Sequence, residues 1–279
     1  MHISNKILAV AAGSALALTM ASCGGGSAGS TTGDTINIGI KYDQPGLGQK
    51  VGEDYKGLDV DVARYVAKEL GFEGDKVVFK ETPSAQRETA LQGGQVALIF
   101  ATYSITDARK EKVSFAGPYF IAGQDLLVSS DNTDITGPDA MNGKTLCSVT
   151  GSTPAEKIKK EYATTVKLFE QDTYSKCVEA LVGGTVDAVT TDNVILAGFA
   201  AQPQYADKLK VVGKPFSTER YGVGLKKGDT ELCTKVNAAL EKMVSDGSWQ
   251  KAVDANVGPS GFKVDASTNP PKPDACASA

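Results

Sequence analysis

The chain has 279 residues, of which 41% are hydrophobic and 22% are charged, and its formal net charge is −4. This composition is typical of a globular protein, and the length is sufficient for two lobes with separate cores. The charge is only mildly acidic and no basic run occurs, which argues against a nucleic-acid partner.

Residues 1–22 resemble a lipoprotein signal peptide. An apolar run at 7–20 is too short to span a membrane, and Met20-Ala21-Ser22-Cys23 is similar to a lipobox. We expect cleavage before Cys23, lipidation of its thiol, and a flexible tether over residues 23–34. The mature protein would then be anchored to the outer face of the cell membrane. An ordinary secretory signal with an incidental cysteine is the alternative.

The segment after the tether predicts a first α/β lobe. Strands are expected at 35–40, 77–80 and 96–101, a polar loop at 41–50, and helices at 57–72 and 84–92. The strand at 96–101 is apolar throughout, as in strands that are buried on both faces of a parallel sheet.

Polar side chains begin where this apolar strand ends, at Thr102 and Ser104. Ligands of open α/β sheets bind beyond the carboxyl ends of the strands. Thr106 is a good N-cap, so the first helix amides and the Arg109 guanidinium are expected to face one small volume. A carboxylate fits there because the guanidinium fork matches two oxygens.

A similar pattern recurs later in the chain. Helix, Gly-Gly and a Val-led strand occur around Gly93-Gly94 and again around Gly183-Gly184, and their alignment places Thr102 opposite Asp192. We interpret this as two α/β lobes with a cleft between their polar strand ends. The alternative is that a helix followed by Gly-Gly and a strand is common in α/β proteins and does not indicate two lobes.

The second lobe is predicted to contain a further helix with a strong start signal. Thr153 is expected to cap it, with Pro154 at its first position and Glu156 completing a capping box. Exposed amides after Gly151 would form a second anion site. Strands are expected at 125–128, 145–149, 166–169 and 186–190, with a helix between the last two.

The chain is expected to cross between lobes at 118–123 and at 214–221, which are natural hinge strands. Lobe 1 would comprise residues 35–122 and 215–279, and lobe 2 residues 123–214. Lobe 1 is completed by helices at 230–245 and 248–256 and by a tail from residue 259.

With Cys23 lipidated, four cysteines remain, and export makes disulfides available to them. Three connectivities are possible. On chain proximity alone we predict Cys147–Cys177 and Cys233–Cys276.

The residues that several classes of enzyme need for catalysis are absent from the sequence. The only histidine is His2, inside the signal peptide, and the chain contains neither a P-loop nor a Gly-x-Ser-x-Gly motif. No carboxylate cluster has calcium-loop spacing. We therefore expect no histidine-based catalysis, no metal and no cofactor.

Several segments resemble the polar-amino-acid solute-binding proteins of ABC importers. The most specific is Ile-Thr-Asp-x-Arg at 105–109, followed by Phe-x-x-Pro-Tyr. The segment KYDQPGLG at 41–48 further resembles the glutamate-binding lipoproteins of Gram-positive bacteria. The other segments are GLDVDVARYVAKELGF, VTGSTPAEKIK, GGTVDAVTTDN and DGSWQKAVDANVG.

The resemblance implies a two-lobed periplasmic-binding-protein fold of type II that closes on one amino acid. Arg109 matches the family arginine that clamps the ligand α-carboxylate, and Asp192 matches the aspartate that receives the α-ammonium. Ser104 and Thr102 match family residues beside that arginine. Ser152 and Thr153 match the family residues of the second lobe that donate hydrogen bonds to the ligand.

The ligand side chain is expected to meet positive charge. In many relatives that take basic amino acids, an Asp stands near the position of Lys41. Many relatives place an aromatic residue near position 84, where this chain has Ser84, and Arg87 follows one helical turn later. Two cations favour a second carboxylate, as in glutamate or aspartate, and disfavour a basic ligand. The alternative is that Lys41 and Arg87 are surface charges.

We therefore expect an extracytoplasmic receptor that delivers glutamate or aspartate to a membrane permease with its ATPase. Glutamine or another polar amino acid is the alternative ligand. Rival functions are a periplasmic dehydratase-like enzyme on the same fold and a receptor that signals to a sensor.

Overall fold

The computed structural model describes residues 31, 32 and 34–276. The predicted signal peptide, the lipidation site Cys23 and most of the tether lie outside these residues. Among the helices of the described part, none combines the length and the apolar character that crossing a bilayer requires.

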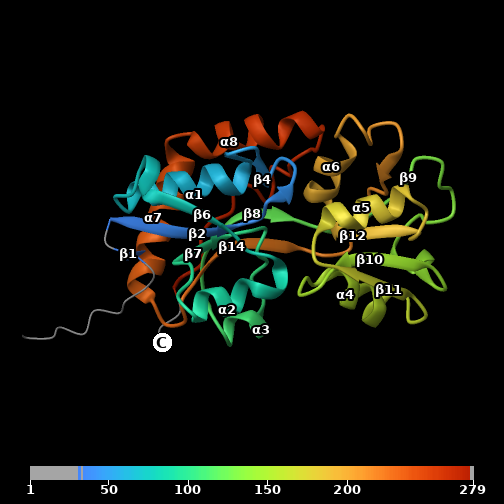
Figure 1. The fold of residues 1–279 in the computed structure, drawn as a ribbon, viewed down its shortest axis with the longest axis horizontal. Helices are drawn as coiled ribbons and strands as arrows, with labels where there is room; N and C mark the ends of the chain where they lie inside the picture. Colours follow the sequence, from blue (N-terminus) through green and yellow to red (C-terminus); the bar gives the residue numbers. More distant parts are fainter. Residues whose placement is uncertain (1–30, 33, 277–279) are drawn as a thin grey trace, which may run out of the picture.

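The first lobe is built on a six-stranded mixed sheet (Figure 1). Strand β2 runs parallel to β6 and β7, and β14 is antiparallel to both β7 and β8. The strands are β1 (Thr31–Thr32), β2 (Thr35–Ile40), β6 (Val77–Glu81), β7 (Leu98–Phe100), β8 (Ser114–Ala122) and β14 (Glu219–Leu225).

Helices cover both faces of this sheet. Figure 1 shows α1, α7 and α8 on one face and the short α2 and α3 on the other. Their bounds are α1 (Leu58–Glu69), α2 (Arg87–Gln92), α3 (Asp107–Lys110), α7 (Thr230–Ser245) and α8 (Ser248–Asn256). The expected helix at 84–92 is confirmed in part, because its first turn, Ser84–Gln86, is a 3-10 helix.

The region predicted as a polar loop at 41–50 carries regular structure instead. Strands β3 (Asp43–Gln44), β4 (Gly48–Val51) and β5 (Asp54–Lys56) form a small antiparallel sheet. These strands are two to four residues long and mostly polar, so they lack the periodicity that reveals a strand.

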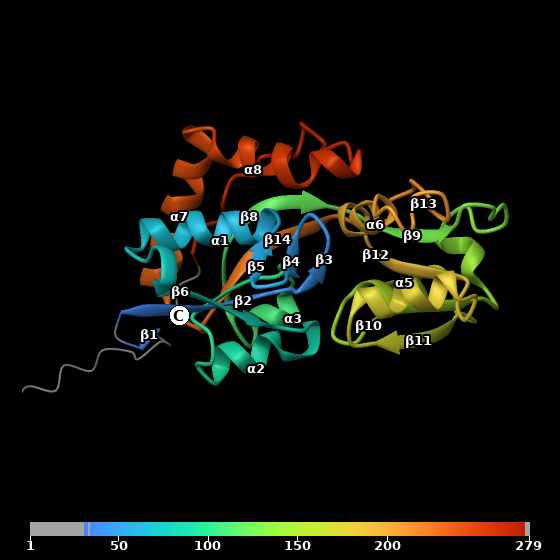
Figure 2. The same ribbon diagram turned by 45° about the horizontal axis from the view of Figure 1, so that its top comes forward.

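The second lobe has a five-stranded sheet, most clearly seen in Figure 2. Strand β10 is parallel to β11 and β12, and β9 is antiparallel to β12 and β13. The elements are β9 (Gln124–Ser129), β10 (Thr145–Val149), α4 (Pro154–Glu161), β11 (Lys167–Gln171), α5 (Tyr174–Val182), β12 (Ala188–Asp192), α6 (Asn193–Ala200) and β13 (Leu209–Val211).

The repeated pattern of helix, Gly-Gly and strand has the same backbone conformation in each lobe. Gly94 and Gly184 adopt φ of +66° and +71°, a region that favours glycine. After each turn the chain joins the neighbouring strand, with Ala97 N–H bonded to Asn37 O and Asp187 N–H bonded to Thr145 O, both at 2.9 Å. The turns therefore align β7 and β12, whose last residues lead to Thr102 and Asp192.

Two chain segments connect the sheets. Strand β8 continues through Gly123 into β9, and the chain returns through residues 212–218 into β14. At the crossing β8 and β14 are paired, with Ala122 opposite Glu219 and Phe120 opposite Tyr221. The connection is thus a two-stranded ribbon, the arrangement expected of a hinge.

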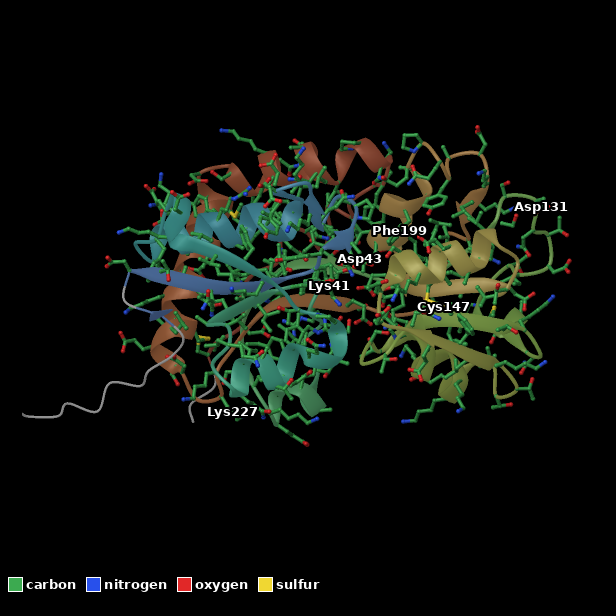
Figure 3. All side chains as sticks on the ribbon, viewed as in Figure 1. Lys41, Asp43, Asp131, Cys147, Phe199 and Lys227 are labelled. Carbon is green, nitrogen blue, oxygen red and sulfur yellow. A yellow bond between two sulfur atoms is a disulfide. The ribbon has the colours of Figure 1, made fainter. Side chains whose placement is uncertain are left out.

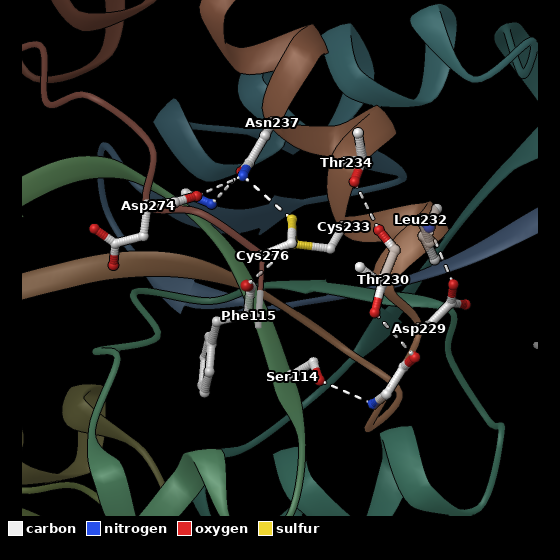
Figure 4. The surroundings of a disulfide bond; sticks show 12 residues. Ser114, Phe115, Asp229, Thr230, Leu232, Cys233, Thr234, Asn237, Asp274 and Cys276 are labelled. Atoms are coloured by element: carbon white, nitrogen blue, oxygen red, sulfur yellow. Dashed lines mark hydrogen bonds between the residues drawn. A yellow bond between two sulfur atoms is a disulfide. The ribbon is translucent and has the colours of Figure 1, made fainter. Parts of the chain in front are cut away.

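Both predicted disulfides, Cys147–Cys177 and Cys233–Cys276, are present. Figure 4 shows the second one, which joins α7 to the C-terminal tail. The tail packs along β8: the Asn269 amide bonds to both backbone groups of Ile121, and Asp274 pairs with Arg220 of β14 at 2.6 Å. The tail therefore lies against both strands of the ribbon.

Candidate functional site

A polar cavity of about 270 Å³, partly open to solvent, lies between the two lobes. Both lobes contribute to its walls, and seven of the eight predicted ligand-binding residues line it. The lining residues are Ser84, Arg87, Thr102, Ser104, Arg109, Ser152, Thr153, Pro154, Tyr174, Thr191, Asp192 and Ile195.

Arg109 is positioned by the short helix α3. Thr106 caps that helix as predicted, because its hydroxyl accepts the Arg109 backbone N–H at 3.3 Å. This amide is therefore already bonded, whereas the Arg109 side chain lines the cavity. Its Nη1 donates to Ser104 O at 2.8 Å, its Nη2 donates to Gly151 O across the cleft at 3.1 Å, and Nε lies 3.5 Å from Glu88 Oε1.

Arg87 lies beside Arg109 and is only 3% exposed, so the alternative that it is a surface charge is wrong. Its acceptors are backbone carbonyls: Ala101 O at 3.1 Å, Ser84 O at 3.3 Å and, across the cleft, Gly151 O at 3.4 Å. No carboxylate that the structure describes forms an ion pair with it. A buried guanidinium without a counter-ion is costly, since burial penalises the charged form. Burial and the Arg109 charge accordingly lower the pKa of Arg87 to about 10.

Lys41 is also buried, at 4% exposure, but it lies one layer behind the cavity wall rather than in it. Its Nζ donates to the Ser84 hydroxyl at 2.7 Å, and Ser84 faces the cavity. Burial, followed by repulsion from Arg87, lowers the pKa of Lys41 to about 7. Figure 3 shows Lys41 and Asp43 close to the junction of the two lobes.

Thr102 is held in an unusual backbone conformation at the cavity wall. Its φ of +44° is in the left-handed region, which a β-branched residue rarely adopts. The buried Asp59 accepts the Thr102 N–H at 2.9 Å and the Tyr119 hydroxyl at 2.7 Å. Burial raises the pKa of Asp59 to about 6 even though both hydrogen bonds oppose this change. We infer that Asp59 stabilises the strained turn.

Asp192 contributes the acidic group of the site from the end of β12. Its Oδ2 accepts the hydroxyl of the buried Tyr221 at 2.6 Å. Burial, and then repulsion from Glu219, raise the pKa of the Asp192 carboxyl well above its usual range. A cation bound beside Asp192 would offset this penalty, so the environment favours an ammonium group there.

Thr153 is the N-cap residue of α4 and Pro154 is its first residue, as predicted, but the expected side-chain cap is absent. The Thr153 backbone is helical, with φ of −96° and ψ of −21°, and its side chain makes no cap hydrogen bond. Instead its hydroxyl accepts Gln124 Nε2 at 2.9 Å, and the Ser152 amide is bonded to Val149 O. Ser152 and Thr153 thus line the second-lobe side of the cavity, and the Ser152 amide, expected to be free, is already bonded.

Several supporting residues of the site were not predicted from the sequence. Tyr174 and Thr191 line the cavity, and Glu88 and Tyr103 lie behind the two arginines. The signal for Tyr103 was its place between two predicted ligand residues, but an aromatic at a strand end is as often part of the core.

The lobes touch each other at several places. Gly151 lies so close to Ala85 that an added Cβ would be 2.7 Å from the Ala85 Cα. At a second contact between the lobes, a Cβ on Gly198 of α6 would be 2.2 Å from Pro45 O. Nearby, the Asp43 carboxylate accepts the Ser175 backbone N–H at 3.0 Å, at the start of α5. These contacts describe lobes that are closed on the cavity.

Two lobes, a two-stranded connection and a polar cavity between them define a binding protein of the periplasmic type. The chain belongs to the bacterial extracellular solute-binding proteins, family 3, whose sequence profile matches residues 36–265.

Known proteins of this kind are similar over most of the chain. The glutamate-binding protein GluB of Corynebacterium glutamicum is 45% identical, with 94% of each chain covered. The ABC transporter glutamine-binding protein GlnH of Bacillus subtilis is 37% identical, covering 78% of this chain and 79% of its own. A solved structure of an ancestral arginine-binding protein bound to glutamine has a TM-score of 0.75 and 35% identity, covering 81% of this chain and 99% of its own.

The lobe contact at Gly198 generates a test of closure. In Gly198→Ala, the added methyl group would meet Pro45 O, and overpacking of this kind costs about 1–3 kcal/mol. Because only the closed form makes this contact, ligand affinity should fall roughly 5- to 150-fold. Thermal stability should not fall, since Ala is the better helix former.

Titration calorimetry measures the affinity, and small-angle scattering with saturating ligand reports closure. Gly258→Ala is the matched control, because nothing lies within 4 Å of its added Cβ. Unchanged affinity in Gly198→Ala would contradict the closed geometry described here.

Proposed function

We propose that the protein is the extracytoplasmic receptor of an amino-acid ABC importer, with an acidic amino acid as its ligand. Glutamate is the first candidate and aspartate the second. The lipidated Cys23 anchors the receptor to the outer face of the cell membrane, and a membrane permease with its cytoplasmic ATPase receives the ligand. Lobe 1 comprises residues 35–122 and 215–279, and lobe 2 residues 123–214.

The proposal of an acidic ligand is supported chiefly by the positively charged groups at the cavity. Arg87 and Arg109 both line it, and Lys41 bonds to Ser84 from behind its wall. Asp192 also lines it, and Glu88 pairs with Arg109. Among the described residues, the hydrogen-bond acceptors of Arg87 are all backbone carbonyls. A ligand with two carboxylates would compensate both guanidiniums, whereas a basic side chain would add to the repulsion.

Each predicted residue then has a role. Arg109 binds the α-carboxylate, with Ser104 and Thr102 beside it. Asp192 binds the α-ammonium, and its raised pKa returns toward the usual range when the cation arrives. The hydroxyls of Ser152 and Thr153 complete the site from the second lobe.

The side-chain carboxylate would extend toward Arg87, with Lys41 acting through Ser84. Because the two guanidiniums converge on Gly151 O, an anion between them would also join the lobes. Ligand binding would therefore favour the closed form, the shape that a permease recognises. No catalytic step is proposed.

The similarity to a glutamate-binding protein over 94% of the chain supports glutamate. Glutamine is the alternative to an acidic ligand, because a relative of 37% identity is named a glutamine-binding protein. The two ligands differ only in the end group of the side chain, so their affinity ratio is the most direct measure of the acidic pocket.

Arg87→Gln tests the pocket. Loss of a charged hydrogen-bonding partner costs about 1.5–3 kcal/mol, so glutamate affinity should fall roughly 10- to 150-fold. Glutamine affinity should change much less, because its amide carries no charge. Calorimetry with both ligands measures the ratio.

Arg220→Gln is the control for that experiment, because Arg220 is a partly exposed arginine that pairs with Asp274 away from the cavity. Equal losses for glutamate and glutamine in Arg87→Gln would refute the acidic pocket.

A second prediction concerns pH. Burial lowers the pKa of Lys41 to about 7, so above pH 7 the free protein loses this charge. A side-chain carboxylate nearby favours protonated Lys41, and glutamate binding must then take up a proton. The ratio of glutamate to glutamine affinity should therefore fall as pH rises above 7, by up to about tenfold per pH unit.

Use of the ratio cancels the titration of Asp192 and Asp59, which affects both ligands alike. The ratio in Lys41→Met should be flat with pH. A flat ratio between pH 6 and 9 in the unaltered protein would exclude the proposed role of Lys41.

A further inference from the structure

Tyr103 is a fully buried aromatic residue directly behind the cavity wall, between the predicted ligand residues Thr102 and Ser104. The guanidinium groups of both cavity arginines contact its ring. The Arg87 Cζ lies 4.2 Å from the ring centroid, and the Arg109 Cζ lies 5.0 Å from it. One aromatic ring is thus shared by two buried guanidiniums.

The ring itself is held on its other sides. Its hydroxyl donates to Glu88 Oε1 at 2.8 Å, and its edge meets Phe115 with ring centroids 4.8 Å apart. On β14, a Cβ added to Gly224 would be 2.8 Å from the Tyr103 Cε1, so a glycine there leaves room for the ring. The ring therefore has little freedom to move.

Two neighbouring guanidiniums need such support. Arg87 and Arg109 both donate to Gly151 O, so they lie side by side and repel each other in a poorly hydrated site. The face of an aromatic ring is negative and attracts cations, most strongly where water is excluded. Burial, and after it the charge of Arg109, lower the pKa of Arg87, whereas the Glu88 carboxylate raises it.

The two arginines do not depend on the ring equally. Arg109 has Glu88 as an ionic partner and a 2.8 Å bond to Ser104 O. Arg87 has longer bonds to three carbonyl oxygens and no described carboxylate. Without the ring, repulsion from Arg109 would displace Arg87 first.

We propose that Tyr103 is a positioning residue for ligand selectivity: its ring holds Arg87 beside Arg109 and so maintains the preference for an acidic over an amide side chain. The inference rests on the proposed function, in which Arg87 meets the side-chain carboxylate. Tyr103 touches no ligand in this arrangement and acts only through the arginines.

The test compares Tyr103→Phe with Tyr103→Leu by calorimetry, using glutamate and glutamine as probes. Phe keeps the ring and loses only the bond to Glu88, so the affinity ratio should stay within about threefold of the parent. Leu removes the aromatic face, and the ratio should fall roughly tenfold or more toward that of Arg87→Gln.

A purely structural role gives a different result. Packing defects would weaken both ligands by the same factor in Tyr103→Leu, and an unchanged ratio in that variant would overturn the proposal. An equal loss of ratio in Tyr103→Phe and Tyr103→Leu would also overturn it, because the hydroxyl rather than the ring would then be responsible.

A second measurement does not require Tyr103→Leu to fold. In the unaltered protein, the nitrogen-bound side-chain protons of Arg87 should give NMR signals shifted upfield by the ring, relative to those of the exposed Arg220. Arg87→Gln identifies these signals by their loss. The same upfield shift should persist in Tyr103→Phe, and its absence from the unaltered protein would contradict the stacked geometry.

The relative affinities of the unaltered protein for glutamate and glutamine distinguish failure of the proposed function from failure of this inference. If it binds glutamine as tightly as glutamate, the proposed function fails and the inference fails with it. If it prefers glutamate and Tyr103→Leu retains that preference, only the inference fails.

Discussion

The central physical constraint of this molecule is the burial of two guanidinium groups side by side. Arg87 and Arg109 are 3% and 8% exposed, and both reach the same carbonyl oxygen of Gly151 across the cleft. Within the described residues only Glu88 pairs with either of them. Such a site favours anions, because an anion replaces both the lost hydration and the missing counter-charge.

The fold creates this constraint by placing groups from two separate sheets around one volume. The Gly94 and Gly184 turns align the central strands so that Thr102 and Asp192 end at the cavity. The paired ribbon of β8 and β14 joins the two sheets and is the arrangement expected of a hinge. Contact at Gly198 then limits how closely the lobes approach. In the proposed function, charge, hinge and close packing together would couple the binding of a small zwitterion to closure of the lobes.

Much of this organisation could be predicted from the sequence, because the core strands and helices have clear hydrophobic periods. The bounds predicted for β2, β10, α7 and α8 agree with the structure. The strand-end pattern, the family resemblance and the charge argument at Arg87 together identified seven of the twelve residues that line the cavity.

Other features depend on tertiary contacts that no local pattern encodes. The small sheet of β3, β4 and β5 is short and polar, so it looked like a loop. Thr153 has the residue type of a cap but bonds to Gln124, a residue distant in sequence. Lys41 was expected in the pocket and lies behind Ser84. The role of Tyr103 becomes visible only when two arginines from different helices lie on its ring.

A crystal structure of the protein grown with L-glutamate would test the account most directly. We predict the α-carboxylate on the Arg109 guanidinium, the α-ammonium on Asp192, and the side-chain carboxylate within hydrogen-bonding distance of Arg87. An Arg109 guanidinium that faces bulk water while no amino acid lies between the lobes would contradict it.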